Sequence, residues 1–79
     1  MRVVVADIQS YGYLGYHALP FSDIKVFGNM QSTEDWLGTY YHSAEKIADH
    51  PNKKQYVYHC ITTNHEVEYI TLYDREIES

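Results

Sequence analysis

The chain has 79 residues, of which 44% are hydrophobic, and eleven Asp and Glu side chains outnumber six Lys and Arg side chains to give a net charge of −5. A chain of this length supports one hydrophobic core, so we expect one domain over residues 1–79. The acidic balance disfavours direct binding to nucleic acid, because phosphate recognition needs clustered cations.

No apolar run is long enough for a transmembrane helix, so no contact with a membrane is expected. The apolar run after Met1 ends at Asp7 and is too short for a signal peptide. Cys60 is the only cysteine and has no partner for a disulfide within the chain, which favours a reducing, cytoplasmic compartment.

Two strands are expected in the first third of the chain. The run from Arg2 to Ile8 is apolar at successive positions, which predicts a central strand, and Ile24 to Phe27 predicts a second, shorter one. Residues 9–22 separate them. Their glycines and Pro20 argue against a regular element, and their apolar side chains argue against disorder, so we expect a long ordered loop.

A helix is predicted from Ser32, a good N-cap, to His50, where Pro51 disfavours helical geometry. Apolar residues recur between these limits at helical spacing and form one stripe that would pack on a sheet. The stripe consists of Trp36, Leu37, Tyr40, Tyr41, Ala44, Ile47 and Ala48.

A β-hairpin follows, with strands over 55–63 and 66–73 and a two-residue turn at Asn64 and His65. This register places Ile61 opposite Glu68 and separates an aliphatic face from a tyrosine-rich face. We expect the aliphatic face to pack under the helix. It carries Val57, His59, Ile61, Ile70 and Leu72, while the other face carries Tyr56, Tyr58, Cys60, Thr62, Val67, Tyr69, Thr71 and Tyr73.

The predicted fold class is therefore α+β. We expect a small, mainly antiparallel four-stranded sheet with one helix packed on a face, in the order β-β-α-β-β. Residues 74–79 are expected to form an acidic C-terminal tail.

The residues that carry chemistry do not form a catalytic or metal-binding motif. Five histidines and one cysteine lack the spacing of a metal site, and adjacent His59 and Cys60 would point to opposite faces of a strand. Cys60 is better interpreted as a small core or interface residue than as a nucleophile. Glu66 and Glu68 are interpreted as solvated rather than as an acid–base pair. No cofactor, metal or catalytic residue is expected.

Nine tyrosines are the most unusual feature of the composition. Tyrosine joins an apolar ring to a polar tip and suits interfaces. The tyrosine face has three interpretations: a half-buried layer under the 9–22 loop, a protein or homodimer interface, or a stacking platform for nucleic acid. The acidic balance weighs against the third interpretation.

We therefore expect a non-catalytic, acidic protein-binding module. The expected partner is a protein with a basic surface, such as a nucleic-acid-handling protein that a phage-encoded inhibitor or DNA mimic would target. The expected partner-binding residues are Tyr56, Tyr58, Glu66, Glu68, Tyr69, Tyr73, Asp74 and Glu76. The alternative is a homodimeric ligand-binding or enzymatic domain, with a pocket between the helix and the 9–22 loop that His17 and His59 would line.

Overall fold

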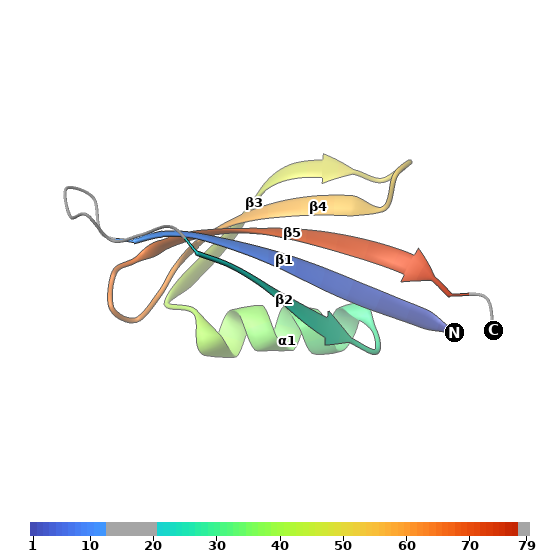
Figure 1. The fold of residues 1–79 in the computed structure, drawn as a ribbon, viewed down its shortest axis with the longest axis horizontal. Coiled ribbons are helices and arrows are strands. Elements are labelled where there is room, and N and C mark those ends of the chain that lie inside the picture. The colour runs from blue at the N-terminus through green and yellow to red at the C-terminus, as the bar shows by residue number, and fades with distance from the viewer. Residues whose placement is uncertain (13–20, 78–79) are drawn as a thin grey trace.

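The structure is a computed structural model that describes residues 1–12 and 21–77. Its five strands form one antiparallel sheet in the order β2-β1-β5-β4-β3, and one helix lies against a single face of that sheet (Figure 1). The predicted α+β class is confirmed, but the sheet has five strands instead of four. The elements are β1 (Arg2–Gly12), β2 (Phe21–Phe27), α1 (Met30–Tyr40), β3 (Ser43–His50), β4 (Gln55–Ile61) and β5 (Val67–Glu76).

Strands β1 and β2 form a longer antiparallel pair than the sequence predicts. Their register runs from Val4 opposite Phe27 to Ser10 opposite Phe21. Residues 9–12 and 21–22, expected in the long loop, therefore belong to strands, while the rest of that loop, 13–20, lies outside the described residues. As expected, β1 lies inside the sheet, because β5 pairs with its other edge.

The predicted helix is wrong at both ends. It begins after Asn29, whose side-chain oxygen accepts a hydrogen bond from the backbone N–H of Ser32 at 2.8 Å. It ends at Tyr40, because Thr39 to His42 is a run of β-branched, aromatic and His residues with weak helix propensity. Residues 43–50 form β3 instead, which satisfies the hydrogen-bonding edge of β4.

The hairpin between β4 and β5 exists, but its register differs by one residue from the prediction. Thr62 donates its backbone N–H to the carbonyl of Glu66 at 2.9 Å, and His65 adopts a positive φ of 64°. The loop thus holds three residues, a common hairpin length with the left-handed residue last. Cys60 pairs with Glu68, so a one-residue shift has moved every side chain of one strand to the other face.

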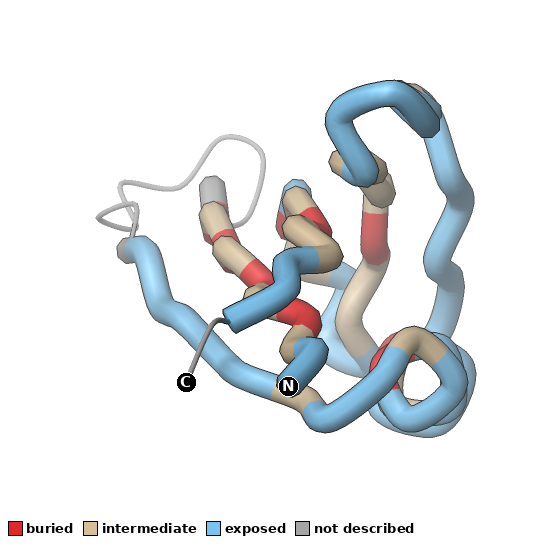
Figure 2. The backbone as a smooth tube through the Cα atoms, turned by 90° about the vertical axis from the view of Figure 1, so that its right-hand side faces the viewer, coloured by how far each residue is buried: buried red, intermediate tan, exposed pale blue. Residues whose placement is uncertain are grey.

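The core lies between α1 and the face of the sheet that α1 covers. Buried side chains are concentrated in the middle strands, while the edge strands and the connecting turns are exposed (Figure 2). Tyr56 and Tyr58 pack against this core because the observed register turns them toward the helix. The buried hydrophobic residues are Val4, Ala6, Ile8, Leu37, Tyr41, Cys60, Ile70 and Leu72.

The end of the chain continues the sheet. Asp74 and Glu76, expected in an acidic tail, pair with Val4 and Arg2 of β1 as the last part of β5. The Arg2 guanidinium donates to the carboxylate of Asp74 at 2.9 Å. The last two residues of the predicted tail, 78–79, lie outside the described residues.

One polar contact crosses the core. The hydroxyl of Tyr41 donates to the Glu68 carboxylate at 2.6 Å, and both residues are more than nine-tenths buried. Burial, and then the hydrogen bond to Glu68, raise the pKa of Tyr41 well above its usual range. The bond fixes the start of the α1–β3 connection to the middle of the sheet.

Replacing Tyr41 by Phe is expected to lower the free energy of unfolding by about 1–3 kcal/mol, because the Glu68 carboxylate then lacks its donor in a buried site. Urea denaturation monitored by circular dichroism measures this loss. The matched control is Tyr40→Phe at the neighbouring position, which is 58% exposed and should change stability by less than about 0.5 kcal/mol. Equal losses in the two variants would contradict the structural role of the Tyr41–Glu68 bond.

The raised pKa of Tyr41 also predicts a dependence of stability on alkaline pH. The unfolded chain loses the Tyr41 proton near about pH 10, whereas the folded chain keeps it. The contribution of Tyr41 is therefore complete below about pH 10 and declines as the pH rises toward the folded-state pKa. Denaturation curves from about pH 9 to 11 should show a steeper loss of stability in the wild type than in Tyr41→Phe. Parallel curves would contradict this prediction.

Candidate protein-binding face

The two faces of the sheet differ in what covers them. We call the face toward α1 the inner face and the opposite one the outer face. In the part of the chain that the structure describes, no helix or strand covers the outer face (Figures 1 and 2). By strand register, the outer face comprises Val3, Val5, Asp7 and Gln9 of β1, Ser22, Ile24 and Val26 of β2, Gln55, Val57, His59 and Ile61 of β4, and Val67, Tyr69, Thr71, Tyr73 and Arg75 of β5.

Three cross-strand rows make up the centre of the outer face. Each row runs across β2, β1, β5 and β4. The first contains Val26, Val5, Tyr73 and Gln55; the second contains Ile24, Asp7, Thr71 and Val57; the third contains Ser22, Gln9, Tyr69 and His59. Half of these twelve residues are valine, isoleucine or tyrosine, and the other half are polar, acidic or His.

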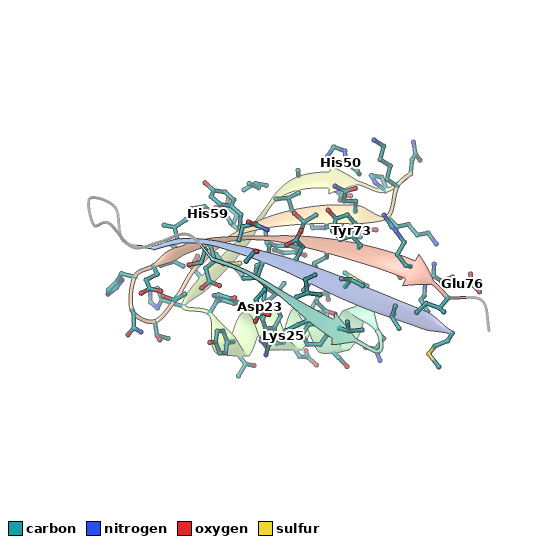
Figure 3. The ribbon with its side chains drawn as sticks, viewed as in Figure 1. Asp23, Lys25, His50, His59, Tyr73 and Glu76 are labelled. Carbon is teal, nitrogen blue, oxygen red and sulfur yellow. The ribbon has the colours of Figure 1, made fainter. Side chains whose placement is uncertain are left out.

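The aromatic side chains of the outer face are held by neighbours. The ring of His59 meets that of Tyr69 edge-on, with 5.3 Å between centroids. The guanidinium of Arg75 lies 5.3 Å from the centre of the Tyr73 ring and donates to the carbonyl of Lys53 at 2.9 Å. His59 and Tyr73 project from the sheet on the side away from α1, whereas Lys25 lies toward the helix (Figure 3). These contacts restrict the orientation of the rings.

The aromatic residues that are predicted to bind a partner do not share one face of the sheet. Tyr69 and Tyr73 lie on the outer face, while Tyr56 and Tyr58 lie half-buried on the inner face. The one-residue difference in register is the cause. A single tyrosine platform therefore does not form on this hairpin.

The acidic residues predicted to bind a partner do not form one patch either. Glu68 is buried and bonded to Tyr41, and Asp74 is paired with Arg2. Glu66 precedes β5 and Glu76 ends it, ten positions later, which corresponds to roughly 30 Å in an extended strand. Glu66 and Glu76, at opposite ends of this strand, are thus the two of these four residues whose carboxylates have no described side-chain hydrogen bond or ion pair.

Sequence reasoning missed the valines and isoleucines of the outer face. Alternating apolar residues in β1 and β2 were the available signal, because Val3 and Val5, like Ile24 and Val26, stand two positions apart. Ile24 is 64% exposed and Val26 is 63% exposed. Such exposure on neighbouring strand positions is typical of a surface that contacts another molecule.

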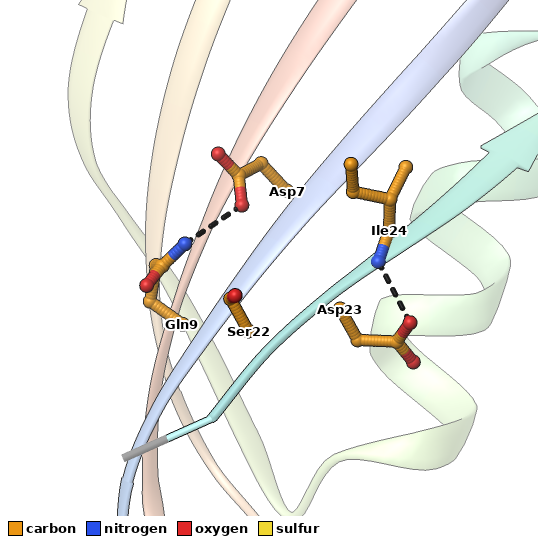
Figure 4. Close-up of a pocket in the computed structure, with 5 residues that line it drawn as sticks. All are labelled: Asp7, Gln9, Ser22, Asp23 and Ile24. Carbon is orange, nitrogen blue, oxygen red and sulfur yellow. Dashed lines mark hydrogen bonds between the residues drawn. The ribbon is translucent and has the colours of Figure 1, made fainter.

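A shallow depression lies where β1 and β2 meet on this side of the sheet. Its walls are formed by Asp7, Gln9, Ser22, Asp23 and Ile24 (Figure 4). Within it, Gln9 donates its side-chain amide to Asp7 at 2.9 Å, and the backbone N–H of Ile24 donates to the carboxylate of Asp23 at 2.8 Å. The polar groups thus satisfy one another.

The described residues provide no catalytic or metal-binding constellation. No group of three or more His, Cys, Asp or Glu residues among them is arranged to hold a metal ion. Cys60 is fully buried on the inner face, and burial raises the pKa of its thiol to about 12. His59 lies on the outer face, so the sheet separates it from Cys60. A thiolate nucleophile activated by this histidine therefore has no geometric basis.

Cys60 is expected to react with an aromatic disulfide reagent at least about 100-fold more slowly in the native protein at pH 8 than in urea, because the thiol is both inaccessible and protonated. Absorbance of the released thiolate follows the reaction. Ser43→Cys supplies a matched control, since residue 43 is an exposed position of β3 and its thiol should react at once. Rapid modification of Cys60 in the folded wild type would show that the site is open.

The described residues include no helix with the length and apolar character that crossing a membrane requires. No protein-family model matches the chain, and neither the curated proteins nor the solved structures include a significant match.

Proposed function

We propose that this chain is a non-catalytic protein-binding module and that its outer face makes the contact. The observation that carries the proposal is the three-row surface, which no described element covers and in which valine, isoleucine, tyrosine and histidine are interspersed with polar side chains. Exposed aliphatic and aromatic side chains among polar groups are the composition of many protein interfaces.

Protein is favoured over nucleic acid as the partner because of the charges on this face. Among the described outer positions of β1, β2, β4 and β5, Arg75 is the cationic side chain, and it is bonded to backbone carbonyls of the neighbouring turn. Phosphate binding by an aromatic platform requires a cationic groove. With a net charge of −5, this chain is poorly suited to a phosphate backbone.

The same charge favours a partner with a basic surface. Asp7 lies in the central row and Glu45 pairs with His59 at the margin, so the outer face carries a carboxylate at its centre and another at its margin. Long-range attraction between an acidic module and a basic partner accelerates association. We therefore propose a nucleic-acid-handling protein as the partner and inhibition or modulation as the role. The DNA-mimic form of this proposal is supported by the net charge alone.

The alternative of a ligand pocket between the helix and the 9–22 loop falls largely on residues 13–20, which lie outside the described residues. Of the described hollows beside α1, the one of about 470 Å³ is lined by helix residues alone and is open to solvent. The one of about 80 Å³ at the C-terminal end of α1 is small beside the roughly 300–1,000 Å³ of ligand pockets. His59 lies on the other side of the sheet, and His17 lies outside the described residues. The smaller hollow is lined by Ile8, Asp23, Lys25, Tyr40, Tyr41 and Glu68.

The proposal is tested by affinity capture from a lysate of the native host, with the wild type and the variants Thr71→Lys and Thr39→Lys as the three baits. Thr71→Lys places a cation at the centre of the outer face, opposite Asp7, where the fold can accommodate it. We expect the affinity for the captured partner to fall roughly tenfold or more, because the lysine disrupts the apolar contact and repels a basic surface. Thr39→Lys, on the exposed side of α1, is the matched control and should bind as the wild type does.

Quantitative mass spectrometry identifies the partner, and biolayer interferometry with the purified partner measures the dissociation constants. Equal affinities for Thr71→Lys and Thr39→Lys would exclude the outer face as the binding surface. A combined Glu66→Lys and Glu76→Lys variant examines the DNA-mimic form separately, since loss of binding in that variant alone would place the contact at the acidic ends of β5.

A further inference from the structure

The two edges of the sheet differ in how they are protected against pairing with another strand. Edge strand β3 is charged and carries a bulge between Lys46 and Ala48, and Lys46 pairs with Asp49 at 3.4 Å. Charges and bulges are the usual devices that prevent edge-to-edge association. Edge strand β2 also carries two charges, Asp23 and Lys25, but it has no bulge: it pairs with β1 in an unbroken register and exposes Ile24 and Val26.

We propose that β2 pairs with β2 of a second copy of this chain, antiparallel, about a two-fold axis at Ile24. Two five-stranded sheets would then join into one continuous sheet. This inference concerns an edge of the sheet, and it holds whichever partner the outer face binds. Its support comes from three features of β2: its sequence, its backbone and its position beside α1.

The sequence of β2 is complementary to itself when reversed. The strand reads Phe-Ser-Asp-Ile-Lys-Val-Phe over residues 21–27. Reversal about Ile24 places each Asp23 opposite Lys25 of the second copy, and it places Phe21 opposite Phe27. The symmetry produces two opposite-charge pairs, one on each side of the axis. Opposite charges directly across antiparallel strands stabilise the pairing, and an isologous interface of this kind closes as a dimer.

The backbone of β2 offers the groups that such a pairing needs. The N–H of Ile24 donates to its neighbour Asp23 at 2.8 Å and therefore points away from β1, toward the free edge (Figure 4). An antiparallel two-fold through a hydrogen-bonded pair requires that geometry, because the two Ile24 residues exchange N–H and carbonyl groups. Asp23 would release this N–H to the second copy and bind Lys25 of that copy instead.

The surroundings of β2 place both members of the charge pair on the same side of the sheet. Lys25 lies on the inner side, with its ammonium 5.4 Å from the centre of the Trp36 ring and 6.0 Å from that of Tyr40. Both α1 helices would therefore lie on one side of the joined sheet, beside the axis. On the other side, Ile24 would meet its symmetry mate, so the central rows of the two outer faces would become continuous.

A charge exchange tests this pairing in the full-length chain. Asp23→Lys and Lys25→Asp each place like charges opposite each other at both positions of the interface. We expect each variant alone to raise the dimer dissociation constant roughly tenfold or more. The double variant Asp23→Lys/Lys25→Asp restores opposite charges and should restore the dimer. An equimolar mixture of the two single variants should form a mixed dimer. Glu45→Lys, at the edge formed by β3, is the matched control and should leave the dimer unchanged.

Association is measured by sedimentation equilibrium at protein concentrations from about 1 μM to 1 mM, which cover dissociation constants of weak to moderate dimers. Circular dichroism verifies that each variant is folded. The interface would be established if the wild type, the double variant and the mixture dimerise while each single variant alone dimerises more weakly. A wild type that stays monomeric throughout would overturn the proposal and assign Asp23 a protective role as a cap on the edge. A dimer that survives both single variants would overturn it as well, because another surface would then be responsible.

Discussion

A single short helix has to cover a five-stranded sheet, and this constraint determines most of the molecule. The 11 residues of α1 span roughly 16 Å, enough to cover part of one face and none of the other. The inner face consequently holds the whole buried core, from Val4 on β1 to Cys60 on β4. The outer face is left with half of the side chains of every strand, and their composition is too apolar for a purely solvated surface.

The loop between β4 and β5 decides which side chains lie on which face. A three-residue loop that ends in a left-handed His65 shifts the register by one position relative to a two-residue turn. Tyr56, Tyr58 and Cys60 therefore face the helix together with Ile70 and Leu72. The same shift brings Glu68 to the inner face, where Tyr41 satisfies its carboxylate, so one loop residue determines both the core and the candidate surface.

The uncovered face and the uncovered edge have different consequences for function. A face presents side chains and selects a partner by their shape and charge, whereas an edge presents backbone groups and selects a strand. In this chain the outer face offers valine, tyrosine and histidine, and the edge of β2 offers a sequence that is complementary to itself. The proposed dimer would enlarge the face by joining its central rows, so that one partner could contact both copies.

Elements whose signals are local could be predicted from the pattern of amino acids. An apolar run predicts β1, and runs of β-branched and aromatic residues predict the β4–β5 hairpin and the second half of β2. Pro51 follows the last residue of β3, although the sequence predicts the end of a helix there. The mixed α+β class followed from these elements. Composition alone indicates an acidic chain with few cations for phosphate binding, and strand geometry predicts that His59 and Cys60 point to opposite faces.

The secondary structure of residues 43–50 and the face on which each hairpin side chain lies depend on tertiary contacts. The segment Ser-Ala-Glu-Lys-Ile-Ala-Asp-His has the composition of a helix, yet it becomes β3 because pairing with β4 satisfies a row of backbone groups that propensity cannot weigh. The predicted binding residues were divided between two faces because register depends on a single loop residue. Which face of the sheet stays uncovered likewise depends on where the described helix lies, which is a property of packing rather than of any local pattern.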